Sequence, residues 1–173
     1  MESVSKIILG TGNYKNVKSG NTLSITGDGG NAWGYYGHSY KRLAPRLITY
    51  EPYKEKLDEL IKLKNDITKI KEYLELRKII EDEYIKSYYE TRLKDLNLNE
   101  LLYILEKKYG NNIILLCHEP IDEFCHRRLF ADYIELETGI YIPEISVDEK
   151  GNIKKISPIR YKNRLKKVIE ESY

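Results

Sequence analysis

The segment that decides the fold runs Ile113-Ile114-Leu115-Leu116-Cys117-His118-Glu119-Pro120-Ile121-Asp122-Glu123-Phe124-Cys125-His126-Arg127-Arg128. It begins with a short apolar run, which is typical of a strand buried on both faces of a parallel sheet. A brief loop follows, and from about Cys125 to Gly139 the apolar residues recur at helical spacing before a glycine stop. This order of strand, loop and helix predicts an α/β fold.

The sequence on both sides of this segment predicts the other elements. We expect strands at residues 6–9, 22–26 and 140–142, and a tight turn at Gly10-Thr11-Gly12-Asn13 after the first strand. A helix capped by Asn97 should end at Gly110. Residues 161–173 have the pattern of a basic amphipathic helix. We therefore predict one α/β domain over residues 1–173, a layered domain with a partly parallel sheet flanked by helices.

Residues 53–93 differ in character, because they are densely charged and contain no glycine or proline. An apolar stripe, Leu60, Leu63, Ile67, Ile70 and Leu74, follows helical spacing. We expect a charged helical insertion, either one long helix or a helical hairpin with its break at Asn65-Asp66. The pattern leaves open whether this insertion is a solvated arm with one buried stripe or an element that forms a homodimer.

Composition bounds the class of protein. The chain has 173 residues, a net charge of +2, 32% charged residues and 41% hydrophobic residues, which is ordinary for a globular domain. Its apolar runs are far shorter than the ~20 residues that span a bilayer, so we expect no membrane partner. The N-terminus lacks a secretory pattern, and we expect a cytoplasmic protein. Two cysteines suit a reducing compartment, although a Cys117–Cys125 disulfide is left open.

The chemistry concentrates where the buried strand ends and the next helix begins. Both cysteines and two of the three histidines lie there. Ligands of open α/β sheets bind beyond the carboxyl ends of strands, and helix N-termini attract anions. The candidate catalytic residues are Cys117, Glu119, Cys125 and His126. Candidate ligand-binding residues are Arg127 and Arg128, which can grip an anion, and Gly10 and Gly12, which could cradle one with their backbone.

Three interpretations of this cluster compete. In the first, Cys117 or Cys125 is a thiolate nucleophile, activated by the helix N-terminus and nearby cations. In the second, Glu119 is the reacting carboxylate and both cysteines pack in the core. In the third, the cysteines with His118 and His126 bind zinc. Adjacent Cys-His pairs do not easily converge on one ion, and their spacing is unlike that of structural zinc sites, so we expect no metal and no cofactor.

Two further features suggest contacts with a ligand. The irregular segment 33–45 offers Trp33, Tyr36, His38, Tyr40 and Arg42, whose rings and charges could hold a base or a sugar, or could simply cover the sheet edge. Residues 150–169 contain eight lysines and arginines and no acid. Such a run either contacts nucleic-acid phosphates or forms a solvated face.

The cluster also resembles the signature of the domain of unknown function 488 family. The resemblance rests on Leu115-Leu116-Cys117-His118-Glu119 followed by Phe124-Cys125-His126-Arg127-Arg128. The stretch 37–45 is similar to the family's Tyr-x-x-Leu-Ala-Pro stretch, and residues 83–89 are similar to its tyrosine-rich helix. The resemblance spans the first strand to Ile145, with residues 53–80 as an insertion. It implies an α/β fold and a site, but no particular reaction.

These observations lead to one functional hypothesis and one alternative. We expect an enzyme or ligand-binding protein that acts on a small anionic, nucleotide-like ligand at the Cys/Glu/His/Arg site. If it is an enzyme, we expect a nucleotide- or nucleoside-processing hydrolase or transferase. The alternative is a non-catalytic nucleic-acid or nucleotide binder that uses the aromatic loop and the basic C-terminal helix.

Overall fold

The computed structural model describes residues 2–172 and contains a six-stranded sheet in the order β3-β2-β4-β1-β5-β6. The strands are β1 (Ile8–Asn13), β2 (Asn21–Ser24), β3 (His38–Ser39), β4 (Ile113–Cys117), β5 (Glu144–Val147) and β6 (Ile153–Ile156). All neighbouring pairs are parallel except β5 and β6, which are antiparallel. The prediction of an α/β fold with a partly parallel sheet is confirmed.

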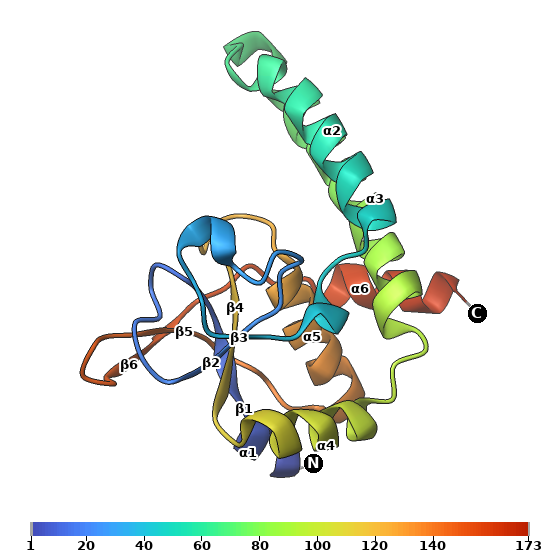
Figure 1. The fold of residues 1–173 in the computed structure, drawn as a ribbon. Helices are drawn as coiled ribbons and strands as arrows, with labels where there is room; N and C mark the ends of the chain where they lie inside the picture. Colours follow the sequence, from blue (N-terminus) through green and yellow to red (C-terminus); the bar gives the residue numbers. More distant parts are fainter. Residues whose placement is uncertain (1, 173) are drawn as a thin grey trace.

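Helices cover one face of this sheet (Figure 1). The helices of the described chain are α1 (Glu2–Ile7), α2 (Leu47–Lys64), α3 (Ile70–Tyr88), α4 (Leu98–Tyr109), α5 (His126–Thr138) and α6 (Lys162–Glu171). A π-helical turn, Tyr89–Leu93, extends α3. The predicted caps are confirmed: Asn97 accepts a hydrogen bond from the backbone N–H of Glu100, and Gly139 ends α5 in the left-handed region. The predicted C-terminal helix is present, although its last residue, Tyr173, lies outside the described residues.

Strand β4 lies at the centre and is buried along its whole length. Because side chains alternate across a strand, Ile113, Leu115 and Cys117 face the main core beneath the helices. Ile114 and Leu116 face a smaller core, which the segment after β1 covers through Val17. The uninterrupted apolar run therefore reflects burial on both faces, as the sequence indicated.

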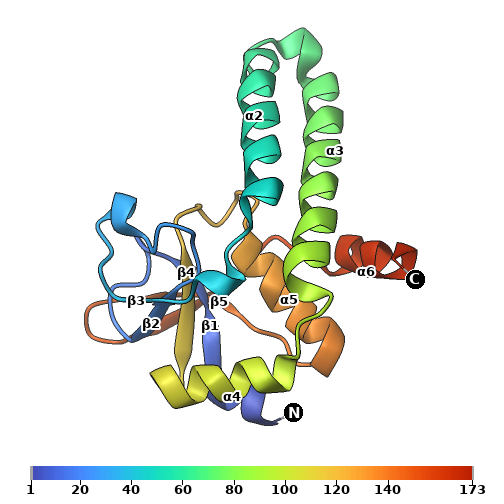
Figure 2. The ribbon, with the colours of Figure 1, turned by 45° about the vertical axis from the view of Figure 1, so that its right-hand side comes forward.

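The predicted insertion is a helical hairpin. Helices α2 and α3 run side by side and project away from the sheet and the other helices (Figure 2). The chain reverses at Asn65-Asp66, as predicted, although α2 already begins at Leu47. Of the apolar stripe, Leu60 is buried and Leu63 packs half-buried against it, whereas Ile67, Ile70 and Leu74 are exposed. The reversal breaks the helical phase, so residues on its two sides no longer share one face.

Two local predictions in the sheet are also wrong. Gly10 to Asn13 is part of β1 rather than a turn, and residues 140–142 precede the strand, which begins at Glu144. The glycines permit close approach of the neighbouring chain. A Cβ at Gly12 would lie 2.5 Å from Cγ2 of Val17, and one at Gly10 would lie 2.8 Å from the carbonyl oxygen of Pro143. The glycines of this central strand therefore gave the same sequence pattern as a turn.

Within residues 2–172, none of the helices combines the length and the apolar character that crossing a membrane requires.

The carboxyl ends of β1, β2 and β4 meet at one edge of the sheet, because these strands are parallel. The base of the α2–α3 hairpin stands over the same edge (Figure 2).

Candidate active site

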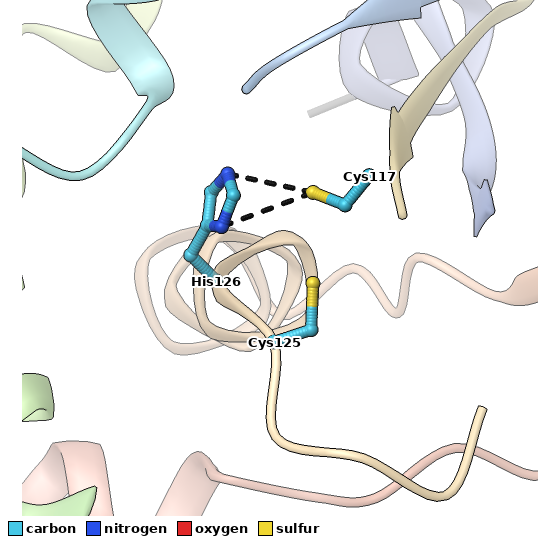
Figure 3. A group of neighbouring side chains, drawn as sticks. All are labelled: Cys117, Cys125 and His126. Atoms are coloured by element: carbon cyan, nitrogen blue, oxygen red, sulfur yellow. Dashed lines mark hydrogen bonds between the residues drawn. The ribbon is translucent and has the colours of Figure 1, made fainter. Parts of the chain in front are cut away.

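Cys117, Cys125 and His126 meet where β4 ends and α5 begins (Figure 3). The sulfur of Cys117 lies 3.4 Å from Nε2 and 3.8 Å from Nδ1 of His126. Nε2 is also 2.7 Å from the carbonyl oxygen of Ile25. Because a carbonyl can only accept a hydrogen bond, Nε2 carries a proton, and in the neutral imidazole the lone pair is then on Nδ1.

Cys125 occupies the N-cap position of α5 and gathers several polar groups around its sulfur. The sulfur accepts hydrogen bonds from the backbone N–H of Arg127, at 3.4 Å, and from Nη1 of the same residue, at 3.2 Å. Oε2 of Glu119 lies 3.2 Å away on another side. The helix N-terminus and the guanidinium both favour negative charge on this sulfur.

Arg127 is held in place by a buried ion pair with Glu144. Nε of Arg127 lies 3.2 Å from both carboxylate oxygens, and Nη2 lies 2.7 Å from Oε2. The hydroxyl of Thr11 donates to the same carboxylate at 2.6 Å. Arg128 is buried as well, and its Nη1 donates to Thr11 and to the carbonyl of Ile142. Both guanidinium groups, predicted to bind a ligand, are thus directed at groups inside the protein.

Burial and neighbouring charge shift the acidities at this site. Burial raises the pKa of Cys117 well above its usual value, and the adjacent Cys125 adds to the rise. Burial would also raise the pKa of Cys125, but the hydrogen bond with Cys117 and the charge of Arg127 together bring it well below its usual value. Burial and the charge of Cys125 raise the pKa of Glu119 well above its usual value. These directions favour the protonated form of Glu119 and the thiolate form of Cys125.

A cavity of about 540 Å³ opens onto these groups. Cys125, His126 and Glu119 form part of its lining, at the edge of the sheet. Aromatic side chains make up much of the remaining wall: Trp33, Tyr50, Tyr53, Tyr84 and Phe124. The cavity falls within the range of volumes that small-molecule sites occupy, roughly 300–1,000 Å³.

The rings in the wall are already arranged for stacking. The indole of Trp33 lies parallel to the imidazole of His118, with ring centroids 4.8 Å apart and planes within 6°. Phe124 packs edge-on against Tyr84. A planar ring system that enters the cavity would therefore meet flat faces and ring edges.

The structure brings together some predicted residues and separates others. Trp33 lines the cavity, as predicted. The described residues that line the cavity do not include Tyr36, His38, Tyr40 or Arg42. Tyr36 is 82% exposed, whereas Tyr40 is buried in the main core. Gly10 and Gly12, expected to form a backbone cradle, lie inside β1, so that expectation is wrong.

Sequence reasoning missed Glu144 and the aromatic residues at the base of the hairpin. One signal for Glu144 was available: it is a lone acid between Pro143 and Ile145, in an otherwise apolar stretch. Such an acid calls for a buried partner. Tyr53 and Tyr84 gave no comparable signal, because tyrosines recur throughout the insertion.

Three of the four candidate metal ligands converge in space. The ligand atoms of Cys117, Cys125 and His126 all lie within 4.8 Å of one another. His118 lies apart from them, stacked on Trp33 with its Nε2 3.5 Å from Glu119. The expectation that the adjacent Cys-His pairs would not all converge on one ion thus holds for His118, while the other three residues do come together.

The basic C-terminal stretch is partly neutralised by acids of other elements. Arg164 pairs with Glu81 and Asp82 of α3. Arg160 pairs with Asp132 and Glu135 of α5. These pairs fasten α6 to the base of the hairpin and to α5.

No family model matches this chain, and no curated protein or solved structure matches it. The resemblance to the domain of unknown function 488 family consequently stays a prediction that rests on the motifs alone.

Proposed function

We propose that this protein is an enzyme that binds a nucleotide-like ligand in the aromatic cavity and transforms it at Glu119, Cys125 and His126. The observation that carries the proposal is the opening of these three side chains onto one cavity with aromatic walls. Stacking rings suit a base, and a carboxyl group on the cavity wall can take up and return a proton. The reaction class that fits is a hydrolase or transferase that processes nucleosides or nucleotides.

The anionic part of the ligand would lie near Lys54. Arg127 and Arg128 face inward, where they hold Glu144 and Thr11. Lys54 is exposed and lines the cavity from the base of α2. We therefore place the base against Trp33 and the phosphate beside Lys54, with Arg127 as a positioning residue that holds Cys125.

The proposal includes membership of the domain of unknown function 488 family. The two motif halves that carry the resemblance, at Cys117 and at Cys125, are the halves that meet in space. It also includes a cytoplasmic location, because both cysteines are free and a reducing compartment keeps thiols in that state.

A thermal-shift screen of the reduced protein against nucleosides, nucleotides, sugar phosphates and short oligonucleotides tests the binding. A ligand that binds only the folded state raises the melting temperature. We expect Trp33→Ala to abolish the shift, and the exposed Tyr36→Ala to leave it intact as the matched control. Lys54→Ala should remove the difference between a nucleotide and its nucleoside. If no compound shifts the melting temperature, the proposal fails.

Turnover is tested with the ligand found in this way. Glu119→Gln should preserve the thermal shift but abolish product formation, followed by chromatography of the reaction mixture. Should Glu119→Gln bind as the wild type does while neither protein forms product, the protein is a binder and not an enzyme. A shift given only by oligonucleotides, with steep salt dependence, would favour the nucleic-acid alternative.

A further inference from the structure

We infer that Cys117, Cys125 and His126 form a binding site for a divalent transition-metal ion, most simply zinc. We call these three residues the Cys-Cys-His triad. They come from the end of β4 and the start of α5, two elements that the sheet and the core hold fixed. Figure 3 shows the two sulfurs and the imidazole directed toward a common space.

The spacing of the ligand atoms suits a tetrahedral ion. Bond lengths of about 2.3 Å to sulfur and about 2.0 Å to nitrogen set a sulfur-to-nitrogen separation of roughly 3.6 Å. The sulfur of Cys117 lies 3.8 Å from Nδ1 of His126, and the ligand atoms of the triad all lie within 4.8 Å of one another. The ion can therefore be bound with small side-chain adjustments.

The surroundings of His126 match those of a metal ligand. Its Nε2 donates to the carbonyl oxygen of Ile25, which leaves Nδ1 free to coordinate. A backbone carbonyl on the second ring nitrogen is the usual way in which proteins orient a metal-binding histidine. The triad is also made of two soft thiolates and an imidazole, the donor types that zinc prefers.

The charge balance of the buried centre permits the ion. Coordination deprotonates both thiols, so two thiolates and one divalent ion sum to zero. Arg127, which also contacts Cys125, is neutralised by Glu144. The centre with the ion bound is therefore neutral overall, and a large cost of burying net charge is avoided.

Three protein ligands leave a fourth position open, which is the pattern of a catalytic ion. Cys125 and His126 line the cavity, and Glu119 lines it beside them but outside the triad. An ion there would supply Lewis acidity toward a ligand or water in the fourth position, and Glu119 would be the neighbouring group that holds or moves a proton. This catalytic use rests on the proposed function, whereas binding of the ion does not.

The test is the metal content of the full-length protein, purified without chelator from zinc-supplemented cells. We expect about one zinc per chain by mass spectrometry. Cys117→Ser, Cys125→Ser and His126→Gln should each lose it, while His118→Gln, the neighbouring histidine outside the triad, should keep it. Zinc in a folded Cys117→Ser variant at the wild-type level would overturn the inference.

Because buried substitutions can unfold the chain, a second measurement uses the wild-type protein stripped of metal and reduced. Added Co²⁺ should give the sulfur-to-metal charge-transfer band and the intense visible bands of a tetrahedral thiolate site. Folded protein that shows neither these bands nor bound zinc would exclude the site. Both readouts are independent of any organic ligand, so a failed ligand screen leaves the metal result standing.

Discussion

Two regions of the molecule place an ion pair in opposite environments. One region is the sheet with the helices packed on it, and the other is the α2–α3 hairpin. In the sheet, the side chains of Arg127 and Glu144 are 1% and 2% exposed, yet they form a two-pronged ion pair. In the hairpin, Lys56 and Glu83 also form an ion pair, but with 49% and 56% of each side chain exposed. The buried pair holds Arg127 against Cys125. The exposed pair of the hairpin remains in water and contributes little to stability.

The same contrast appears in the packing. The main core joins the sheet to helices α1, α3, α4, α5 and α6. The projecting part of the hairpin has a separate small cluster, Leu60, Tyr73 and Ile80. The cavity uses only the base of the hairpin, through residues such as Tyr53 and Tyr84. We therefore expect substitutions in the sheet to cost much more stability than substitutions in the projecting part.

The largest expected effect is that of Arg127→Ala. Removing one partner leaves the Glu144 carboxylate buried and unpaired, which should lower the free energy of unfolding by roughly 3–5 kcal/mol. Lys56→Ala, the matched change in the hairpin, should cost no more than about 1 kcal/mol. Urea denaturation followed by circular dichroism measures both. Equal effects of the two substitutions would remove the contrast between buried and exposed charge.

A double substitution sharpens this result. Arg127→Met with Glu144→Leu removes both charges together, so much of the stability lost in Arg127→Ala should return. The double variant should nevertheless lose any turnover, because Cys125 loses the guanidinium that holds it. A double variant as unstable as Arg127→Ala would mean that the pair itself contributes the stability.

The next effect concerns close packing in β1. In Gly12→Ala the new Cβ would meet Val17 and the carbonyl of Ile145, and overpacking of this kind should cost about 1–3 kcal/mol. Gly27→Ala is the control, since a Cβ there has no atom within 4 Å; we expect a change within about 0.5 kcal/mol. The urea denaturation midpoints of the two variants, compared with that of the wild type, measure this difference. A harmless Gly12→Ala would favour the tight turn predicted from the sequence over a closely packed strand.

A smaller effect is expected when the hairpin is shortened. Replacing residues 57–80 by a short Gly-Asn linker removes the small cluster but keeps Lys56, Glu83 and the base of both helices. Because chain length in such a connection has a weak effect on stability, we expect less than about 1 kcal/mol of change. Ligand-induced thermal shifts and metal content should persist. Loss of both in a folded variant would show that the projecting part shapes the site.

The segment from β4 to α5 is the part of the candidate site that could be predicted from sequence alone. Ile113 to Cys117 was predictable because an uninterrupted apolar run of this length, followed by a loop, is typical of a strand buried on both faces. Cys125 was predictable as a helix start. The two meet because a short loop joins a strand to the helix that packs on it. Cys117, Glu119, Cys125 and His126 could thus be grouped from local order alone.

The sequence was insufficient where a contact joins distant segments. Glu144 lies 17 residues beyond Arg127 of α5 and begins strand β5, so its role depends on the pairing of β5 with β1. Gly12 resembles a turn residue until Val17 and Ile145 are seen to occupy the space of its side chain. Tyr53 and Tyr84 reach the cavity only because the hairpin stands over the sheet edge. Each of these facts is a property of the tertiary packing.

The smallest effect on stability is expected at the exposed apolar side chains of the hairpin. Ile67 is 86% exposed and Leu74 is 57% exposed, so Leu74→Lys should change the free energy of unfolding by no more than about 0.5 kcal/mol. The homodimer that the sequence left open beside a solvated arm would bury such side chains, and a lysine there would oppose it. If the hairpin forms that dimer, light scattering after size exclusion shows a dimer for the wild type and a monomer for folded Leu74→Lys. A wild type that is monomeric at every concentration would identify the hairpin as a solvated arm. The hairpin would then differ from the sheet in role as well as in the burial of its charges.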